Sequence, residues 1–499
     1  MEVFGFVLYL LAVLGIGLLF FFRSKGSNEK DYFLGGRQMG PFVTAMSAQA
    51  SDMSGWLLMG FPGSILAFGL GQAWIGIGLA IGTALNWLLV AKRLRLFSRA
   101  ANDSITLPQY LSNRFMTGSP VLQVICAIIF LVFFTLYVAS GFIAGATVFS
   151  NLFGGLDKAL ALVIFAGIIL VYTFLGGFNA VCWTDFVQGM MMLVALLAVP
   201  IIMLASGGVN MEKAELLHIT DGFTMNPFTA SYAEIASGLA WGLGYFGMPH
   251  ILVRFMSIKS HKRIKTSSTV AIVWVLLTLG AAILMAYFAR SFFHGGVSFW
   301  AALQASGGQE QIFIELVRIL FPGFIAGILL SAIIAAAMST ADSQLLVASS
   351  SFTSDIYRPL IRKNASEREY LVVGRIVVVA VSIVACVIAY FTMDGESAIM
   401  SMVDNAWGGF GASFGPVIIL SLYWRRLTYK GAIAGVLAGA VTDIAWLFLL
   451  TEKTGIYELL PGFIVGMLAC ILVSLIDKKP AKEIDELFET AISAKLEEE

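Results

Sequence analysis

The chain has 499 residues, of which 59% are hydrophobic and 12% are charged, and its formal net charge is zero. An ordinary soluble domain carries about twice this charged fraction, so these residues cannot cover the surface of a soluble enzyme. Because no long basic block suggests a nucleic-acid partner, the composition predicts an all-α polytopic membrane protein.

Thirteen apolar segments meet or approach the length that a membrane-spanning helix needs. A helix requires about 20 residues to cross a hydrocarbon layer of about 30 Å. We therefore predict one transmembrane domain over residues 1–476 and a charged cytoplasmic tail at 477–499 that forms a short amphipathic helix. The expected spans are residues 3–22, 41–68, 72–91, 120–148, 158–176, 181–205, 232–254, 267–290, 321–348, 370–392, 398–423, 430–450 and 457–476.

The basic residues predict the orientation of these spans. The first apolar run, residues 3–22, is followed by Arg23, Lys25 and Lys30 and is preceded by no basic residue. Because positive charge favours the cytoplasmic side, we expect the N-terminus outside and a permanent first span, not a signal peptide. With alternating spans, 26 of the 31 Lys and Arg residues then fall on the cytoplasmic side, where the C-terminus also lies.

A polar stretch interrupts the second expected span at residues 47–56. Ser51 and Asp52 compete for helical hydrogen bonds and Gly55 loosens the backbone, so we expect a broken helix here. A break frees carbonyl and amide groups about halfway across the bilayer, where transporters build ion and substrate sites. The alternative is a face of small residues for helix packing, with Asp52 paired to a neighbouring helix.

The ninth expected span carries a stripe of oxygen atoms. Ala336, Ser339, Thr340 and Ser343 share one face at helical spacing and present a backbone carbonyl and three hydroxyl groups. Neutral oxygen ligands without histidine or cysteine suit a hard, weakly held cation such as sodium. The alternative is that these hydroxyl groups bond back to their own helix, as is common in membrane helices.

An aromatic stripe marks the seventh expected span. Trp241, Tyr245 and Pro249 follow one another at four-residue spacing with glycines beside them, and Pro249 is expected to kink the helix. Indole and phenol rings at membrane depth offer an apolar wall and a cation–π surface to a small solute with an ammonium group. Simple helix packing is the alternative interpretation.

Acidic residues form a further group of candidates. Asp185 opens the sixth expected span, and with Asp342 and Ser343 it forms a candidate second cation site, although an interfacial helix cap is the alternative. Asp404 and Asp443 also lie in apolar runs, and the sequence assigns them no role. The four histidines cluster with neither acids nor cysteines, so no catalytic constellation predicts an enzyme.

Taken together, these features resemble the sodium/solute symporter family, and most closely its bacterial proline-transporting members. The specific part of the match is the Gly35-Gly36-Arg37 loop followed by the break at residues 50–56. The resemblance also rests on Asp31 to Leu34, Leu107-Pro108, Tyr137, the stripe from Trp241 to Pro249, Ser339-Thr340 and Phe414-Gly415-Pro416.

The resemblance implies a fold and a function. The fold is an inverted repeat of five plus five helices of the amino-acid/sodium symporter type, with discontinuous helices at the midplane. The implied repeats cover about residues 41–205 and 232–423. No internal repeat is visible in the sequence itself. The implied function is sodium-coupled import of a small zwitterionic amino acid, most closely L-proline, by alternating access across the bacterial inner membrane. Sodium is the coupling ion, and neither a cofactor nor an obligate protein partner is expected.

The resemblance also implies the ligands. The family places its principal sodium between the first broken helix and the eighth core helix. The matching groups here are the carbonyls of Ala50, Met53 and Ala336 and the hydroxyls of Ser339 and Thr340. The residues implied for the substrate are Asp52, Ser54, Gly55, Trp56, Tyr137, Trp241, Tyr245 and Pro249.

Two departures from the family pattern keep alternatives open. Proline-transporting members carry glutamine where this chain has Met248, so another amino acid, a carboxylate or a sugar acid remains an alternative substrate. Proline-transporting members usually lack an acid at the position of Asp342, and relatives that bind two sodium ions use the position of Asp185. A second sodium ion or a proton-linked step is therefore an alternative to the coupling of one sodium ion to one solute molecule. A transporter-like sensory module is a third alternative, against which the short tail argues.

Overall fold

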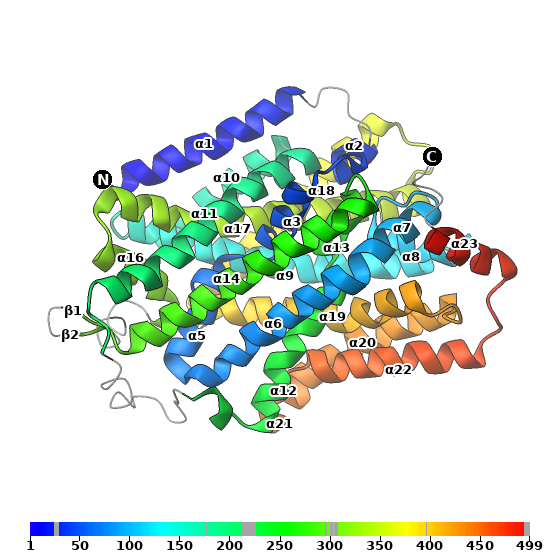
Figure 1. Ribbon diagram of the computed structural model, residues 1–499. Coiled ribbons are helices and arrows are strands. Elements are labelled where there is room, and N and C mark those ends of the chain that lie inside the picture. Colours follow the sequence, from blue (N-terminus) through cyan, green and yellow to red (C-terminus); the bar gives the residue numbers. More distant parts are fainter. Residues whose placement is uncertain are drawn as a thin grey trace.

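The structure, a computed structural model, describes residues 1–23, 29–175, 177–210, 226–294, 297–299, 303, 308–395 and 397–493. It is a bundle of long helices, with the two termini at opposite ends (Figure 1). The first half contains α1 (Glu2–Arg23), α2 (Glu29–Leu34), α3 (Pro41–Ala50), α4 (Gly55–Leu58), α5 (Gly60–Phe68), α6 (Ala73–Leu85), α7 (Lys92–Ala100), α8 (Leu107–Arg114), α9 (Val121–Leu152), α10 (Lys158–Leu175) and α11 (Phe178–Ala205).

The second half continues the bundle and adds one small hairpin, in which β1 (Phe293–His294) pairs antiparallel with β2 (Val297–Ser298). Its helices are α12 (Tyr232–Ala240), α13 (Pro249–Ser257), α14 (Ile264–Arg290), α16 (Ile312–Leu320), α17 (Gly323–Ser351), α18 (Glu367–Thr392), α19 (Ala398–Tyr423), α20 (Tyr429–Leu449), α21 (Thr451–Thr454), α22 (Leu459–Ile476) and α23 (Lys482–Ser493). Short 3-10 segments are η1 (Gly35–Arg37), η2 (Leu70–Gln72), η5 (Pro227–Thr229), η6 (Trp241–Phe246), η7 (His261–Arg263) and η8 (Gln309–Gln311), and π-helical segments are η3 (Asn86–Ala91) and η9 (Phe352–Ile361).

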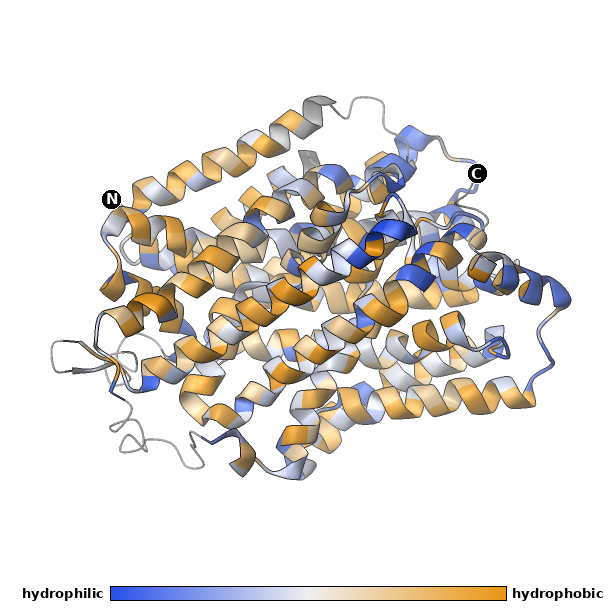
Figure 2. Cartoon of the chain, in the orientation of Figure 1, coloured by the Kyte–Doolittle hydropathy of each residue, from blue (hydrophilic) through white to orange (hydrophobic). Residues whose placement is uncertain are grey.

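Helices occupy all thirteen segments that the sequence predicts to cross the bilayer. Among the described residues, nine helices are long and apolar enough to cross a membrane, and Glu2–Ile16, Gly55–Phe68 and Lys158–Thr173 are shorter apolar helices. Hydrophilic residues gather at the ends of the bundle, most densely around α7 and α23 (Figure 2). The chain is therefore a multi-pass membrane protein, while the count of thirteen crossings stays a prediction.

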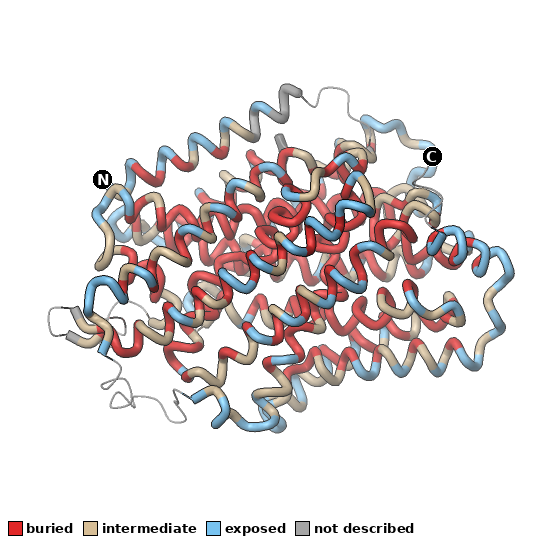
Figure 3. Tube along the Cα trace, in the orientation of Figure 1, coloured by how far each residue is buried: buried red, intermediate tan, exposed pale blue. Residues whose placement is uncertain are grey.

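The core of the bundle surrounds α17 and α19. Of the most apolar 18-residue window in each of these helices, 83% is buried, compared with 28% for α18 at the periphery. In Figure 3 the buried residues fill the interior of the bundle and exposed ones lie along its outer helices. A helix that is buried on all sides and still carries hydroxyl and carboxyl groups, as α17 does, must satisfy them by contacts with its neighbours.

The break expected in the second span is confirmed. Helix α3 ends at Ala50, and α4 begins at Gly55 after four residues that lie outside any helix. The amide of Ser54 donates to the carbonyl of Asp52 over 3.0 Å, a local turn that replaces the helical pattern. The polar side chains at residues 51–54 thus end one helix and start another inside the bundle.

The seventh expected span is also discontinuous, and here the expectation of a kink at Pro249 is wrong in detail. Helix α12 ends at Ala240, η6 follows, and α13 starts at Pro249 after Met248 adopts an extended conformation. The residue before a proline is driven towards extended backbone, and proline suits the first position of a helix, so Pro249 begins a new helix instead of bending a continuous one.

Glycines allow η6 to approach its neighbours closely. A Cβ atom at Gly82 would lie 2.2 Å from the carbonyl oxygen of Gly242, and one at Gly244 would lie 2.0 Å from Nε1 of Trp407. Neither position could hold a side chain without movement of backbone or of a buried indole ring. The glycines beside the aromatic stripe therefore allow close contacts with backbone and with the Trp407 indole, which occupy the space that a side chain would take.

The C-terminal tail forms the expected amphipathic helix. In α23, Ile484, Leu487, Phe488 and Ala491 are buried while the charged residues between them face outwards. The Phe488 ring packs edge-on against Phe97 of α7, with ring centres 4.9 Å apart. The tail is therefore docked on α7 at the end of the bundle where the C-terminus lies.

Candidate functional site

The break in the second span lies directly against the hydroxyl stripe of α17. Ser339 Oγ donates to the carbonyl oxygen of Ala50 over 2.8 Å and lies 3.1 Å from the carbonyl oxygen of Ala336. Thr340 is buried beside Ser339, and in the described part of the chain its hydroxyl group has no hydrogen-bond partner. Three of the five oxygen groups predicted for sodium thus meet in one buried region, and Thr340 follows Ser339 on the same helix.

Met53 is the fifth predicted sodium ligand. Its amide donates to the carbonyl of Gln49 over 3.0 Å, and its side chain is fully buried. No hydrogen bond in the described residues links Met53 to Ser339 or Thr340. The structure therefore leaves its carbonyl available but does not itself assign that group to the cluster.

Asp52 connects the break to two other elements. Its backbone carbonyl accepts from the Tyr137 hydroxyl at 3.1 Å and from Trp56 Nε1 at 3.2 Å, and its Oδ2 accepts from the Tyr245 hydroxyl at 2.6 Å. Its other carboxylate oxygen, Oδ1, is buried and has no hydrogen-bond partner among the described residues. A buried carboxylate oxygen without a partner, close to two phenol groups and an indole, can accept a hydrogen bond from a donor group of a ligand.

The predicted aromatic residues meet around the same point. The Trp241 ring lies 6.4 Å from Trp56 and stacks on Trp407 at 6.2 Å and on Tyr457 at 5.2 Å. The Tyr245 ring packs edge-on against Trp407 at 5.0 Å. Trp241 is only 4% exposed, so the aromatic group is enclosed in this conformation.

The remaining predicted substrate residues border this group. Ser54 precedes α4, and Gly55 opens α4 so close to α9 that a Cβ atom there would meet Ala144 at 2.6 Å. Pro249 is buried at the start of α13. The sequence therefore located the aromatic and polar residues of one buried region, but it did not predict that η6, a 3-10 segment, would carry Trp241 and Tyr245.

A second buried polar group lies among α3, α11, α13 and α17. The guanidinium of Arg254 forms an ion pair with Asp185 Oδ2 at 3.2 Å, and Ser47 Oγ donates to the same carboxylate oxygen at 2.6 Å. Ser343 joins them through a hydrogen bond from Arg254. Asp342 is fully buried, and neither of its carboxylate oxygens has a hydrogen-bond partner in the described residues.

Sequence reasoning missed two members of these groups. Arg254 lies at the end of the seventh expected span, where it was counted as one more cytoplasmic charge. A basic residue within an apolar run was the available signal, because such a residue needs a buried partner. Trp407 is the second, and no feature of the sequence connects it with Trp241, whose carbonyl accepts from Trp407 Nε1 at 2.8 Å.

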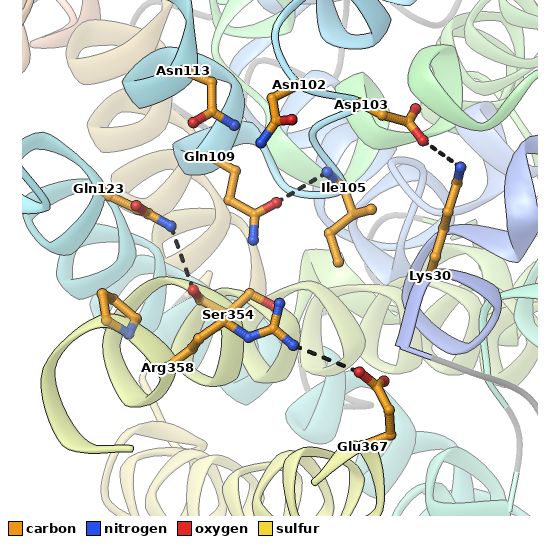
Figure 4. Close-up of a pocket in the computed structure, with 11 residues that line it drawn as sticks. Lys30, Asn102, Asp103, Ile105, Gln109, Asn113, Gln123, Ser354, Arg358 and Glu367 are labelled. Atoms are coloured by element: carbon orange, nitrogen blue, oxygen red, sulfur yellow. Dashed lines mark hydrogen bonds and ion pairs between the residues drawn. The ribbon is translucent and has the colours of Figure 1, made fainter. Parts of the chain in front are cut away.

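A polar cavity of about 560 Å³ lies apart from these groups. Lys30, Asp103, Gln123, Arg358 and Glu367 are among the residues that line it, and none of the predicted site residues does (Figure 4). It opens between α2, the α7–α8 loop and the start of α18, and it is bordered by an ion pair of Lys30 with Asp103.

The α7–α8 loop is held by Asp103. Arg37 Nε lies 2.9 Å from Asp103 Oδ1, and Lys30 pairs with Oδ2. Partial burial raises the pKa of the Asp103 carboxyl, but the hydrogen bond from Lys30 and the charges of Arg37 and Lys30 outweigh it, so that pKa lies below its ordinary value. The carboxylate therefore ties α2, η1 and the α7–α8 loop together in its ionised form.

The sequence model of the sodium:solute symporter family matches residues 32–439, which include both discontinuous spans and α17. The chain belongs to this family. As a family member it is a transporter and not an enzyme, and sodium is its expected coupling ion.

Two relatives are similar along almost their whole length. The sodium/proline symporter of Haemophilus influenzae is 44% identical over 497 residues, covering 98% of this chain and 97% of the relative. The sodium/proline symporter of Escherichia coli is 42% identical over 487 residues, covering 97% and 95%. Such identity over a full chain preserves the fold and the order of the elements described above.

Among solved structures, a sodium-coupled sialic acid symporter in a substrate-bound, outward-open state superposes with a TM-score of 0.76. It is 18% identical and covers 96% of this chain and 98% of its own. The two proteins therefore share a fold, and the discontinuous helices of this chain belong to a symporter architecture.

Proposed function

We propose that this protein is a sodium-coupled symporter that imports L-proline across the bacterial cytoplasmic membrane by alternating access. The observation that carries the proposal is the bond from Ser339 to the carbonyl of Ala50, because it joins a hydroxyl stripe to a broken helix beside Asp52. The relatives named sodium/proline symporter, at 42% to 44% identity, support proline as the solute.

Sodium would bind where α17 meets the break. Its ligands in this proposal are the carbonyls of Ala50, Met53 and Ala336 and the hydroxyls of Ser339 and Thr340. An incoming ion would take the place of the hydrogen bond between Ser339 and Ala50: the hydroxyl would keep its proton and turn its lone pair towards the ion, beside the hydroxyl of Thr340. Such neutral oxygens hold a monovalent cation weakly enough for release, which transport requires.

The solute would bind on the other side of the same break. Its carboxylate would face the amide groups of Gly55 and Trp56 at the start of α4, since the amides of Met53 and Ser54 already donate to Gln49 and Asp52. Its ammonium group would face Asp52 Oδ1, the buried oxygen without a hydrogen-bond partner in the described residues. The pyrrolidine ring would pack on Trp241 and Tyr245, with Trp56 and Tyr137 completing the wall together with Ser54, Gly55 and Pro249. Apolar rings with a few fixed polar groups are typical of small-molecule sites.

Sodium and solute would be coupled through the break itself. An ion that bridges Ala50 and Ser339 fixes the backbone that follows, and residues 53–56 then receive the solute in one geometry. A ligand shifts an equilibrium only by its differential affinity for the two states, so this shared backbone is the link that makes the ligands reinforce each other. One charge moved through about 100 mV with a tenfold sodium gradient supplies roughly 3.7 kcal/mol, enough for roughly a few hundredfold accumulation.

The proposed topology has thirteen spans, with the N-terminus outside and the C-terminus in the cytoplasm. The proposed repeats, 41–205 and 232–423, each begin with a discontinuous helix, α3–α4 in the first and α12–η6–α13 in the second. Discontinuous helices at corresponding positions of two halves are the usual pointer to a central site. The termini at opposite ends of the bundle agree with an odd number of spans (Figure 1).

Uptake of labelled proline into proteoliposomes tests the proposal. An inward sodium gradient should drive proline above its equilibrium level, and an equal potassium gradient should not. Competition by an excess of other amino acids, short carboxylates and sugar acids would show whether proline is the preferred solute, which Met248 leaves as the main question. Sodium-driven flux of another solute and not of proline would replace the substrate, and absence of any sodium-driven flux would refute the transporter proposal.

A further inference from the structure

Arg254 lies fully inside the bundle and uses all three of its guanidinium nitrogens. Its Nε donates to Ser47 Oγ at 3.1 Å, Nη1 donates to the carbonyl of His250 at 2.7 Å, and Nη2 donates to Asp185 Oδ2 at 3.2 Å and to Ser343 Oγ at 2.5 Å. The side chain is 1% exposed and Asp185 is not exposed at all. One positive charge is therefore fixed between α3, α11 and α17.

The atoms that surround this charge are those of the candidate second cation site. The sequence predicts that site from Asp185, Asp342 and Ser343, and the guanidinium already contacts Asp185 and Ser343. Ser47 Oγ and Ser343 Oγ also donate to Asp185 Oδ2, so this oxygen accepts from three donors. A sodium ion seeking the same oxygens would have to approach a like charge at close range in a dry interior.

The charges of the region also favour one free cation. Arg254 and Asp185 balance each other as an ion pair. Asp342 is left with two carboxylate oxygens that no hydrogen bond reaches in the described residues. Asp342 lies two positions after Thr340 on α17 and forms no ion pair with Arg254 in the described residues, so the Arg254 charge is balanced by Asp185 alone.

We propose that the Arg254 guanidinium is a built-in cation that fills the second cation position between Asp185 and Ser343, so that each transport cycle couples a single sodium ion. Arg254 is thus a positioning residue that acts through Asp185 and does not touch the solute. The inference rests on the sodium coupling proposed above and adds the stoichiometry. It also explains how a chain can keep the acids of a two-sodium relative without a second ion.

The test counts sodium ions bound to the purified full-length protein in detergent, with radioactive sodium at equilibrium. The wild type should bind one ion, and Arg254→Met should bind two, with a Hill coefficient that rises from about one towards two as the second position opens. Arg254→Lys keeps a tethered cation and should bind one. The double variant Arg254→Met with Asp185→Asn removes both charges and should also return to one ion.

The double variant also guards against misfolding, because removal of one partner leaves a buried charge unpaired while removal of both does not. Two sodium ions on the wild type, or one ion on Arg254→Met at unchanged affinity, would overturn the inference. Should Arg254→Met not fold, the double variant decides: it should bind one ion at the wild-type affinity, and a tenfold or greater loss of sodium affinity would instead make Asp185 a sodium ligand. No sodium on the wild type would refute the proposed function itself.

Discussion

Ser339 of α17 donates a hydrogen bond of 2.8 Å to the carbonyl oxygen of Ala50, the last residue of α3. The two residues are 289 positions apart, and each belongs to a different proposed repeat. A carbonyl at the end of a helix has no partner within that helix, so a ligand or a neighbouring side chain must satisfy it. In this protein the hydroxyl of Ser339 satisfies the carbonyl of Ala50, so the hydroxyl stripe of α17 lies against the break after α3.

The first prediction concerns this contact. Ser339→Ala or Thr340→Ala should raise the sodium concentration for half-maximal proline uptake by about tenfold or more, because each removes one oxygen ligand of a charged group, worth about 1.5–3 kcal/mol. Proline binding at saturating sodium should change much less. Uptake measured over a range of sodium concentrations checks both statements.

Ser331→Ala is the matched control for these variants. Ser331 is a buried serine of the same helix, and among the described residues its hydroxyl donates to the carbonyl of Gly327 alone, at 2.8 Å. Its loss should leave the sodium dependence as it is. An unchanged sodium dependence in both Ser339→Ala and Thr340→Ala would remove the proposed sodium site.

The second prediction concerns Asp52. Tyr245→Phe removes the 2.6 Å hydrogen bond to Asp52 Oδ2 and leaves both carboxylate oxygens unpartnered. A buried group that loses a charged hydrogen bond costs about 1.5–3 kcal/mol, so proline affinity should fall by about tenfold or more. Tyr110→Phe is the control, because in the part of the chain that the structure describes the Tyr110 hydroxyl bonds to Ser421 Oγ alone, at 2.9 Å. Equal effects in the two variants would contradict a special role for Tyr245.

The third prediction separates aromatic binding from aromatic packing. Trp241→Ala should weaken proline binding at every sodium concentration, because the ring supplies the wall on which the solute packs. Trp241→Phe should lose less, since an aromatic face remains. Trp446→Ala is a control outside the proposed repeats, because Trp446 lies on α20 and its indole donates to the carbonyl of Ile456. Intact proline affinity in folded Trp241→Ala would make this ring packing only.

The fourth prediction concerns the close approach of α6 and η6. Gly82→Ala places a methyl group 2.2 Å from the carbonyl oxygen of Gly242, so one of the two backbones must move. Overpacking of this kind costs about 1–3 kcal/mol, and the unfolding temperature in detergent should fall. Gly280→Ala on α14 meets no atom within 4 Å and should not lower it. Equal unfolding temperatures for the two variants would contradict the tight contact.

The fifth prediction concerns pH. The pKa of Asp103 lies below its ordinary value, so the ion pairs with Lys30 and Arg37 stabilise the fold above the carboxyl's unfolded pKa of about 3.9. That contribution is lost as the pH falls through the lowered pKa. Asp103→Asn should cost about 1 kcal/mol or less at pH 7, and its difference from wild type in unfolding temperature should shrink as the pH is lowered below about 4.

Asp394→Asn serves as the control for this pH series. Asp394 faces Lys158 at 3.7 Å with 80% of its side chain exposed, so its ion pair is open to solvent and should contribute less at any pH. A constant difference between Asp103→Asn and wild type over the whole range would contradict the ion-pair explanation.

The sequence by itself determined the class of the protein and most residues of its central region. Charged residues are so rare in this chain that each polar residue within an apolar run, such as Asp52 or Ser339, marks a place where lipid cannot be the neighbour. The break at residues 51–54 was also legible, because serine, aspartate and glycine together disfavour a continuous helix.

Only the tertiary structure decided which of these residues meet. Tyr245 and Asp52 are 193 positions apart, and Arg254 and Asp185 are 69 apart, so no local pattern connects either pair. The sequence indicated two aromatic residues in a helix, and Asp185, Asp342 and Ser343 for a second cation. Packing of discontinuous helices placed a phenol on Asp52 and a guanidinium on Asp185, because buried charges and chain breaks must find partners wherever the fold supplies them.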